Sequence, residues 1–176
     1  MSLDTVLDDR LVLQPLGVDH YSAVRHLHAS SLRTQTIGVL SEAEIVAFTK
    51  LVYSPAYTAI LMKEETFGAW FDGELVGTAS WQTNTASGLT ARIGSIFVAH
   101  PRHGIGRRLL VEVEGRVHHS GFGRLSAGVT ANAVPFFERF GYAVASHGTK
   151  TLSLGCALPV TFVRKDLSAP RSSGLH

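Results

Sequence analysis

Cysteine is nearly absent from this chain of 176 residues, in which Cys156 stands alone. A single cysteine excludes an internal disulfide and agrees with a reducing compartment. No uninterrupted apolar run approaches the roughly 20 residues that cross a bilayer. The first ten residues also lack the basic start and apolar core of a secretory signal. We therefore expect a soluble, cytoplasmic protein that has no membrane partner.

An excess of charge of one sign is also missing. The chain has 16 Lys and Arg against 14 Asp and Glu, a formal net charge of only +2. The basic cluster Arg102–Arg108 has no aromatic ladder or broad basic face beside it, so we expect no nucleic-acid partner. Histidines stand close together at His26 and His28 and at His118 and His119, but no Cys, Asp or Glu completes a ligand set. The sequence therefore predicts no metal site.

The composition is that of one folded domain. Hydrophobic residues make up 45% and charged residues 17% of the chain, and this length suits a single core better than two. We expect one domain over residues 1–167, followed by a disordered tail over residues 168–176.

Hydrophobic periodicity and turn signals predict alternating strands and helices. Ser41 and Glu44 form a capping box at the start of a helix, and Asp72-Gly73 is a strong hairpin signal between two β-rich runs. The expected elements are a strand at 11–15, helices at 19–32 and 42–52, a hairpin over 67–81, a strand at 91–98, a helix at 104–119, a strand at 124–129, a helix at 133–140, and strands near 142–146 and 160–163.

The most informative run is His103-Gly104-Ile105-Gly106-Arg107-Arg108, which lies between a strand and an amphipathic helix. Glycines let the backbone approach a ligand closely, and a helix start offers free N–H groups and a positive dipole end. This arrangement predicts a phosphate site, although the glycines could also serve turn geometry alone. A P-loop is excluded because no Lys-Ser or Lys-Thr follows Gly106. A dinucleotide fingerprint is excluded because Leu109 stands at its third glycine.

Two motifs together resemble the GCN5-related N-acetyltransferase (GNAT) superfamily. The run ARIGSIFVAHPRHGIGRRLLVEVEGRV is similar to the family's strand, pyrophosphate loop and following helix. The run ANAVPFFERFGY resembles the family's frequent N-A-V-P-F-Y-E-R-x-G-F. The resemblance implies an α/β (α+β) fold with a central mixed, mostly antiparallel sheet flanked by helices on both faces. It also implies acetyl-CoA as the acetyl donor and a possible homodimer.

The resemblance also implies positions at the cofactor. It assigns the backbone of Ile96, Phe97 and Val98 to pantetheine, the backbone of His103, Gly104, Ile105, Gly106, Arg107 and Arg108 to pyrophosphate, the side chains of Arg102, Arg107 or Arg108 to the outer phosphates, Asn132 to pantetheine, and Phe136 and Phe137 to the thioester end. Other roles remain open for several of them. The arginines could form a solvated basic edge, the two phenylalanines could be core, and Asn132 could cap the helix that begins at Ala133.

Catalytic residues are less determined. Many family members have a tyrosine acid where Phe137 stands here, so an acid would have to be Tyr142, bound water or the substrate. The loop is also about two residues shorter than usual, which puts Pro101 at the motif's start. His100 is the candidate base because a histidine follows the strand there. The rival bases are His28, Glu64, Glu65 and Asp72.

The expected function is acetyl transfer from acetyl-CoA to a primary amine by direct attack in a ternary complex. Cys156 has no histidine partner in the sequence, which argues against a covalent thiol route. The alternative is a CoA- or acyl-CoA-binding regulatory module that kept the fold and lost turnover. The sequence does not identify the amine acceptor.

Overall fold

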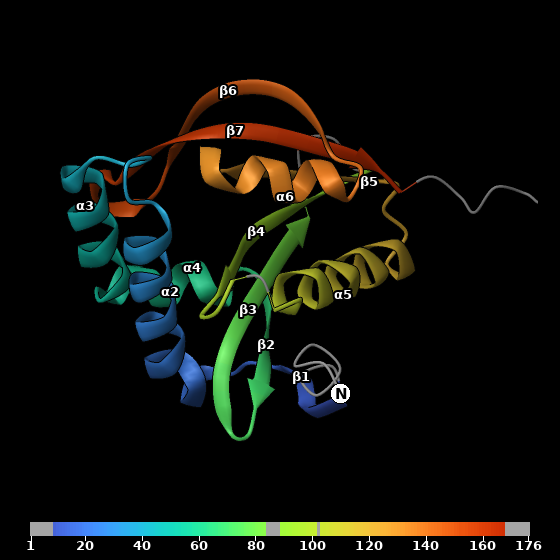
Figure 1. The fold of residues 1–176 in the computed structure, drawn as a ribbon, viewed down its shortest axis with the longest axis horizontal. Coiled ribbons are helices and arrows are strands. Elements are labelled where there is room, and N and C mark those ends of the chain that lie inside the picture. Colours follow the sequence, from blue (N-terminus) through green and yellow to red (C-terminus); the bar gives the residue numbers. More distant parts are fainter. Residues whose placement is uncertain (1–8, 84–88, 102, 168–176) are drawn as a thin grey trace, which may run out of the picture.

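Seven strands form one sheet in the order β1-β2-β3-β4-β5-β7-β6. The structure is a computed structural model that describes residues 9–83, 89–101 and 103–167. Neighbouring strands are antiparallel except β4 and β5, which run parallel. Helices lie on both faces of the sheet (Figure 1). The predicted fold class, a mixed and mostly antiparallel sheet flanked by helices, is confirmed.

The strands are β1 Leu11–Pro15, β2 Glu65–Phe71, β3 Glu74–Thr83, β4 Thr90–Val98, β5 Arg124–Val129, β6 Ala143–Thr151 and β7 Ala157–Asp166. The helices are α2 Tyr21–Gln35, α3 Glu42–Val52, α4 Pro55–Met62, α5 Ile105–His119 and α6 Val134–Arg139, with short 3₁₀ turns at Val18–His20, Ala131–Ala133 and Ser153–Gly155.

Local signals form as predicted at two places. Ser41 Oγ accepts from the Glu44 backbone N–H at 3.1 Å, and the Glu44 carboxylate accepts from the Ser41 N–H at 2.8 Å. This reciprocal pair starts α3 by satisfying two otherwise free donors. Asp72 and Gly73 both have positive φ, 51° and 80°, which is the conformation of a two-residue hairpin turn between β2 and β3.

Other elements differ from their predicted bounds. Asp19 does not cap α2, because it lies inside a 3₁₀ turn and His20 holds the N-cap position. Helix α2 continues to Gln35, one turn beyond the predicted end. The helix α4 was not predicted, although Pro55 after Ser54 fits a helix start. Strands β6 and β7 are about twice as long as predicted. Nearly all of β6 is exposed and shows no apolar alternation, so the sequence pattern did not indicate its full length.

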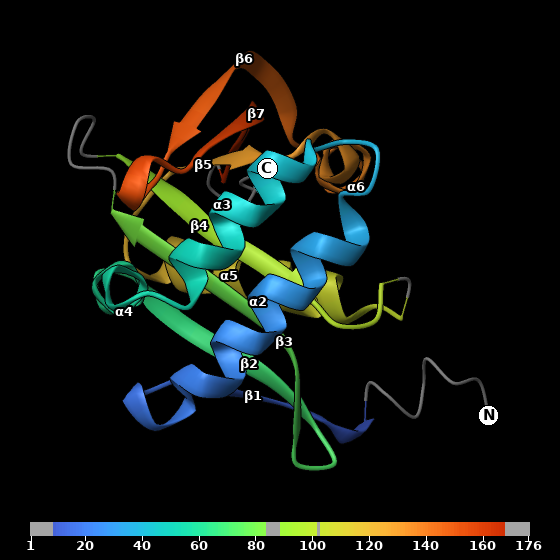
Figure 2. The same ribbon diagram turned by 90° about the vertical axis from the view of Figure 1, so that its left-hand side faces the viewer.

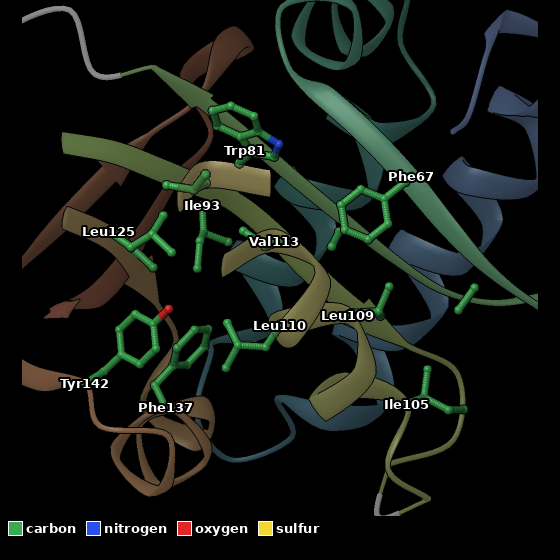
Figure 3. Close-up of a cluster of buried hydrophobic side chains, with 14 of the residues drawn as sticks. Phe67, Trp81, Ile93, Ile105, Leu109, Leu110, Val113, Leu125, Phe137 and Tyr142 are labelled. Atoms are coloured by element: carbon green, nitrogen blue, oxygen red, sulfur yellow. The ribbon is translucent and has the colours of Figure 1, made fainter. Parts of the chain in front are cut away.

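One apolar core lies between α5 and the sheet. Ile105, Leu109, Val113 and Val117 recur every four residues on α5 and are all buried, as the helical stripe predicts. They pack with side chains of the sheet and of α6, including Phe137 (Figure 3). This contact fixes the start of α5 against the end of β4.

The opposite face of the sheet carries α2, α3 and α4, with α2 and α3 in front of the strands and α5 behind them in Figure 2. A second core forms there around Val24, Leu51 and Val52, which are fully buried. In the described ranges no single helix is long and apolar enough to cross a membrane, while α3 and α4 meet that test only as a pair bent by 78°.

Candidate functional site

A cleft opens where β4 and β5 separate. The two parallel strands pair from Thr90 with Arg124 to Ile93 with Ala127, and the pairing then ends. The space between the diverging strands is about 540 Å³ and is lined by β4, β5, α4, and the turn between β6 and β7. Peptide groups of β4 beyond Ile93 therefore face a gap instead of a neighbouring strand.

The ladder to β3 decides which β4 groups face the gap. The Ala99 N–H donates to the Val76 carbonyl at 2.8 Å, and Phe97 lies opposite Thr78. Because alternate residues of an antiparallel strand bond to the same side, Phe97 pairs toward β3 while Ile96 and Val98 turn toward the gap. The predicted backbone role thus fits Ile96 and Val98. The Phe97 backbone is engaged by the sheet, and its ring stacks on His28 with 4.1 Å between centroids.

Part of the open edge is already occupied by α2. The Val98 carbonyl accepts from Ser31 Oγ at 3.0 Å and from Gln35 Nε2 at 2.7 Å. These bonds tie α2 to the end of β4. The groups of this edge that remain available to a ligand amide are the N–H of Val98 and both groups of Ile96.

The glycine loop forms the start of α5. Gly104 is the N-cap residue with φ 78° and ψ 2°, a left-handed conformation, and no side chain caps this helix end. The N–H groups of Ile105, Gly106 and Arg107 precede the first intrahelical bond and have no acceptor within the helix. The Arg108 N–H donates to the Gly104 carbonyl at 3.1 Å, so its predicted backbone role at a pyrophosphate is not available. At Gly106, a Cβ would lie 3.4 Å from the Phe136 ring, so the backbone passes close to α6. The geometry is that of an anion site.

The loop side chains surround this helix start. Arg107 is exposed, and His103 and Arg108 are partly buried. Arg102 lies outside the described residues, so its predicted role has no structural counterpart here.

Three predicted residues come from the segment around α6. Phe137 is buried, with 4% of its surface exposed, and lines the cleft. Phe136 packs edge-on against it at 5.2 Å. Asn132 is exposed within a 3₁₀ turn. It does not cap α6, because that helix begins at Val134 with Ala133 as its N-cap.

The two candidate catalytic residues lie away from the cleft lining. His100 is exposed beyond the end of β4. Tyr142 is 3% exposed and sits in the core beneath α5, where its hydroxyl donates to Glu114 at 2.9 Å (Figure 3). Burial, and then the Glu114 carboxylate, raise the pKa of this phenol. Both placements argue against direct contact with a substrate in the cleft.

A different constellation occupies the end of the cleft near α4. Ser80 pairs with Ser95 and Trp81 with Ile93, so Gly94 is an extra residue of β4 and forms a bulge. A Cβ on Gly94 would lie 2.5 Å from Glu64 Cδ, so only glycine lets this carboxylate pack on the strand. Lys150 Nζ donates to the Gly94 carbonyl at 2.9 Å.

These groups influence one another electrostatically. Burial lowers the pKa of Lys150, the nearby Glu64 carboxylate partly offsets this, and Arg92 lowers it further. Burial raises the pKa of Tyr57, and Glu64 raises it again. Glu64, Lys150, Arg92 and Tyr57 all line the cleft. Sequence reasoning named Glu64 only as a rival base and missed the other three, because distant segments bring them together.

Tyr57 is held by a buried histidine. His28 Nδ1 is hydrogen-bonded to the Tyr57 hydroxyl, at 2.5 Å, and Nε2 to Thr78 Oγ1 at 2.7 Å. Burial lowers the pKa of His28 to about 3, so the ring stays neutral near pH 7. His28 is therefore a support beneath the cleft and has no access to a substrate proton.

Metal ligands do not gather in the part of the chain that the structure describes: no three His, Cys, Asp or Glu side chains are placed to hold an ion. The arrangement combines a cleft that contains an open strand edge and a carboxylate with an anion-binding helix start just beyond the end of that strand. It suits a long phosphorylated ligand that delivers a reactive group to a nucleophile.

The comparisons agree with this geometry. Residues 36–155 match the model of the acetyltransferase (GNAT) domain, and the chain belongs to this family. No curated protein sequence matches the chain. A GCN5-related N-acetyltransferase of Rhodopseudomonas palustris superposes with a TM-score of 0.78 at 23% identity, over 89% of this chain and 95% of the other.

Two further similar structures were solved with a cofactor. PaiA N-acetyltransferase of Thermoplasma acidophilum, in complex with coenzyme A, has a TM-score of 0.70 at 15% identity over 89% of this chain and 98% of its own. YncA of Salmonella typhimurium, with its cofactor acetyl-CoA, has a TM-score of 0.63 at 16% identity over 93% and 97%. At these identities the likeness concerns the fold.

Proposed function

We propose that this protein transfers an acetyl group from acetyl-CoA to a primary amine by direct attack in a ternary complex. One observation carries the proposal: the open strand β4 has a carboxylate, Glu64, packed against it at Gly94 inside the cleft, and its carboxyl end leads to the uncapped helix start at Gly104. Membership of the GNAT family and the CoA-bound relatives support the choice of acetyl-CoA as donor.

The cofactor would bind mainly through backbone groups. The pyrophosphate would accept from the N–H groups of Ile105, Gly106 and Arg107 in the first turn of α5, where the helix dipole favours negative charge. The pantetheine amides would pair with Ile96 and the Val98 N–H along the open edge of β4. Phe137 would bound the thioester end as an apolar wall.

In the transfer step, the amine nitrogen attacks the thioester carbon, a C–N bond forms and the C–S bond breaks. The amine must first lose a proton, and we assign its acceptance to Glu64, directly or through one water. Among the carboxylates of the described residues, Glu64 alone lines the cleft. After the attack the nitrogen carries one surplus proton, which it loses as the amide forms, and the departing CoA thiolate gains one proton.

Tyr57 is the phenol best placed to supply the proton to the thiolate. Phe137 has no hydroxyl, and the Tyr142 hydroxyl is bonded to Glu114. Tyr57 lines the cleft, and burial and Glu64 raise its pKa, which keeps it protonated. If His28 carries its proton on Nδ1 and donates to the Tyr57 oxygen, the phenol hydrogen is free for the sulfur.

The test is release of free CoA from acetyl-CoA in the presence of a panel of primary amines, beside thermal unfolding with acetyl-CoA, CoA, ATP and NAD. Ligand at about 100 times its Kd adds ~2.7 kcal/mol and should raise Tm by roughly 5–10 °C for this size. A shift with both CoA forms and turnover with an amine are expected.

Phe137 keeps a second candidate function open, that of a CoA-binding regulatory module without turnover. A thermal shift with both CoA forms, combined with no CoA release across the amine panel, would favour this module. If neither CoA nor acetyl-CoA raised Tm, both candidate functions would be overturned. A cytoplasmic location and a homodimer stay predictions of this proposal.

A further inference from the structure

The part of the cleft around Glu64 and Gly94, where the amine acceptor would bind and which we call the acceptor end, is positively charged. Among its described lining residues, Lys63, Arg92 and Lys150 are basic and Glu64 alone is acidic. A simple alkylamine is itself a cation near neutral pH, so like charges would oppose its entry. An amine that carries its own anionic group would enter without this penalty.

Glu64 and Lys150 both approach Gly94. The Glu64 carboxyl carbon packs 2.5 Å from the ideal Cβ position of Gly94, and Lys150 Nζ is 2.9 Å from the Gly94 oxygen. Since Cβ and O of one residue are about 3 Å apart, the carboxylate and the ammonium are at most about 9 Å apart.

An α-amino acid fits within this limit. Its nitrogen and carboxylate oxygens are separated by about 3 Å, and a charge-assisted hydrogen bond of about 2.8 Å at each end gives a span of about 8–9 Å. The Lys150 ammonium has three N–H donors, of which Gly94 uses one, so two can serve a bound anion.

Arg92 adds a second cation on the same side. It lies opposite Gln82 on β3, and the Gln82 amide oxygen accepts from Arg92 Nε at 3.3 Å and also from Arg92 Nη2 once the amide is oriented to satisfy both groups. The guanidinium retains donors for a carboxylate, which it can hold in a bidentate manner.

Much of the remaining lining is apolar, beside a few uncharged polar residues such as Gln82 and Thr151. The helices and β7 contribute Leu32, Phe48, Ile60, Leu61, Leu158 and Val160 to the lining. Such walls favour an acceptor with an apolar side chain. A long polar side chain would lose its hydration there without gaining hydrogen bonds, which costs binding free energy.

We propose that the acetyl acceptor is a free α-amino acid with an apolar side chain, whose carboxylate binds Lys150 and Arg92 while its amine faces Glu64. This inference rests on the proposed acetyl transfer. It excludes the N-terminus of a peptide as the preferred acceptor, because a peptide has an uncharged carbonyl at that position.

The experiment compares matched acceptors with acetyl-CoA held saturating. L-phenylalanine is compared with L-phenylalaninamide and 2-phenylethylamine, and L-leucine with L-leucinamide and 3-methylbutylamine. We expect kcat/KM for each amino acid to exceed that of its amide and its decarboxylated partner by at least tenfold. Equal or higher kcat/KM for the amides or the simple amines would overturn the amino-acid proposal and leave acetyl transfer intact.

Variants locate the preference. Lys150→Met and Arg92→Met should each lower the ratio of kcat/KM for amino acid over simple amine by roughly tenfold. Lys50→Met removes an exposed cation at the end of α3 and should leave this ratio unchanged. If both cleft variants keep the wild-type ratio, the carboxylate is bound elsewhere and the assignment is wrong.

Binding separates failure of this inference from failure of the proposed function. If no acceptor is acetylated, binding of 3-phenylpropanoate to the CoA complex is measured by calorimetry. Binding that Lys150→Met weakens would retain the carboxylate site in a protein without turnover. No binding of the carboxylate, together with no turnover, would overturn both proposals.

Discussion

The two ends of the cleft are built in different ways. The cofactor end consists of backbone groups from one continuous segment, the β4 edge and the helix start at Gly104. The acceptor end consists of side chains from separate elements, with Glu64 next to β2, Arg92 on β4 and Lys150 on β6. The first end is an open row of peptide groups, whereas the second is a charged cluster around a bulge.

This difference separates binding from chemistry. Backbone N–H groups and a helix dipole hold an anion without selecting the reaction. Side chains with defined charge decide which acceptor enters and where its proton goes. Changes at one end should therefore affect cofactor affinity, and changes at the other should affect turnover and acceptor choice.

The largest effect is expected from Glu64→Gln. The amide keeps the shape of the side chain against Gly94 and removes the proton acceptor, so kcat should fall by about 10²–10⁴-fold. The measurement is CoA release at saturating acetyl-CoA and acceptor. Glu65→Gln is the matched control, because Glu65 is exposed and pairs with Arg116 outside the cleft. A kcat of the Glu64→Gln variant within threefold of wild type would remove Glu64 from the mechanism.

Gly104→Asp should act on the other end. A carboxylate at the start of α5 repels the pyrophosphate, and a charge separation near 4–5 Å makes a loss of roughly 10–100-fold in acetyl-CoA affinity reasonable. Asp is among the few residues that tolerate the left-handed conformation of Gly104. The helix should therefore persist.

The readout for Gly104→Asp is the rise in Tm that acetyl-CoA produces. Gly115→Asp places the same charge on an exposed position in the middle of α5 and serves as control. Equal stabilisation of both variants by acetyl-CoA would show that the pyrophosphate does not bind at Gly104.

A smaller effect concerns stability on the acceptor side. The folded-state pKa of His28 is about 3, against 6.5 for an unperturbed histidine, because burial penalises the charged ring. Below pH 6.5 His28 therefore binds a proton in the unfolded chain but stays neutral in the folded protein. The stabilisation is complete above pH 6.5 and is lost as pH falls toward 3, by about 2 kcal/mol between pH 7 and pH 5.

Urea unfolding of wild type and His28→Gln at pH 7 and pH 5 measures this contribution of His28 to the free energy of unfolding. The variant should be less stable at pH 7 and should lose about 2 kcal/mol less on acidification. His26→Gln, an exposed position on the same helix, should behave like wild type. The same pH dependence in wild type and His28→Gln would contradict a neutral buried His28.

The smallest effect is expected far from both ends. Arg124 pairs with Asp166 at 2.8 Å, and both side chains are about half exposed or more. Exposed pairs contribute roughly 0–1 kcal/mol, so Arg124→Met should change the free energy of unfolding by less than about 1 kcal/mol. Acetyl-CoA affinity and kcat should both remain at wild-type values. A large loss of either would show that the sheet transmits effects from this edge to the cleft.

The same contrast explains what the sequence could predict. The cofactor loop, the Ser41 capping box and the Asp72-Gly73 turn are set by neighbours in the chain, so residue types and spacing were sufficient. The sequence could not tell that the Phe97 backbone faces β3, because the side to which a strand residue bonds depends on the register with β3. Local pattern contains no information on that register.

The acceptor end could not be predicted in the same way. Glu64 and Lys150 come together only through Gly94, the bulged residue of β4 that both of them approach, Glu64 from the start of β2 and Lys150 from the end of β6. No spacing in the sequence marks such a contact. A lone glycine inside a strand run was the available signal, since it often marks a bulge or a close approach. Gly94 is such a glycine.

Calorimetric titration of acetyl-CoA into wild type, Glu64→Gln and Gly104→Asp tests the division of the cleft most directly. The account predicts the same Kd for wild type and Glu64→Gln, and a Kd at least tenfold higher for Gly104→Asp. A normal Kd for Gly104→Asp, or a loss of binding in Glu64→Gln, would contradict the assignment of cofactor binding to one end and chemistry to the other.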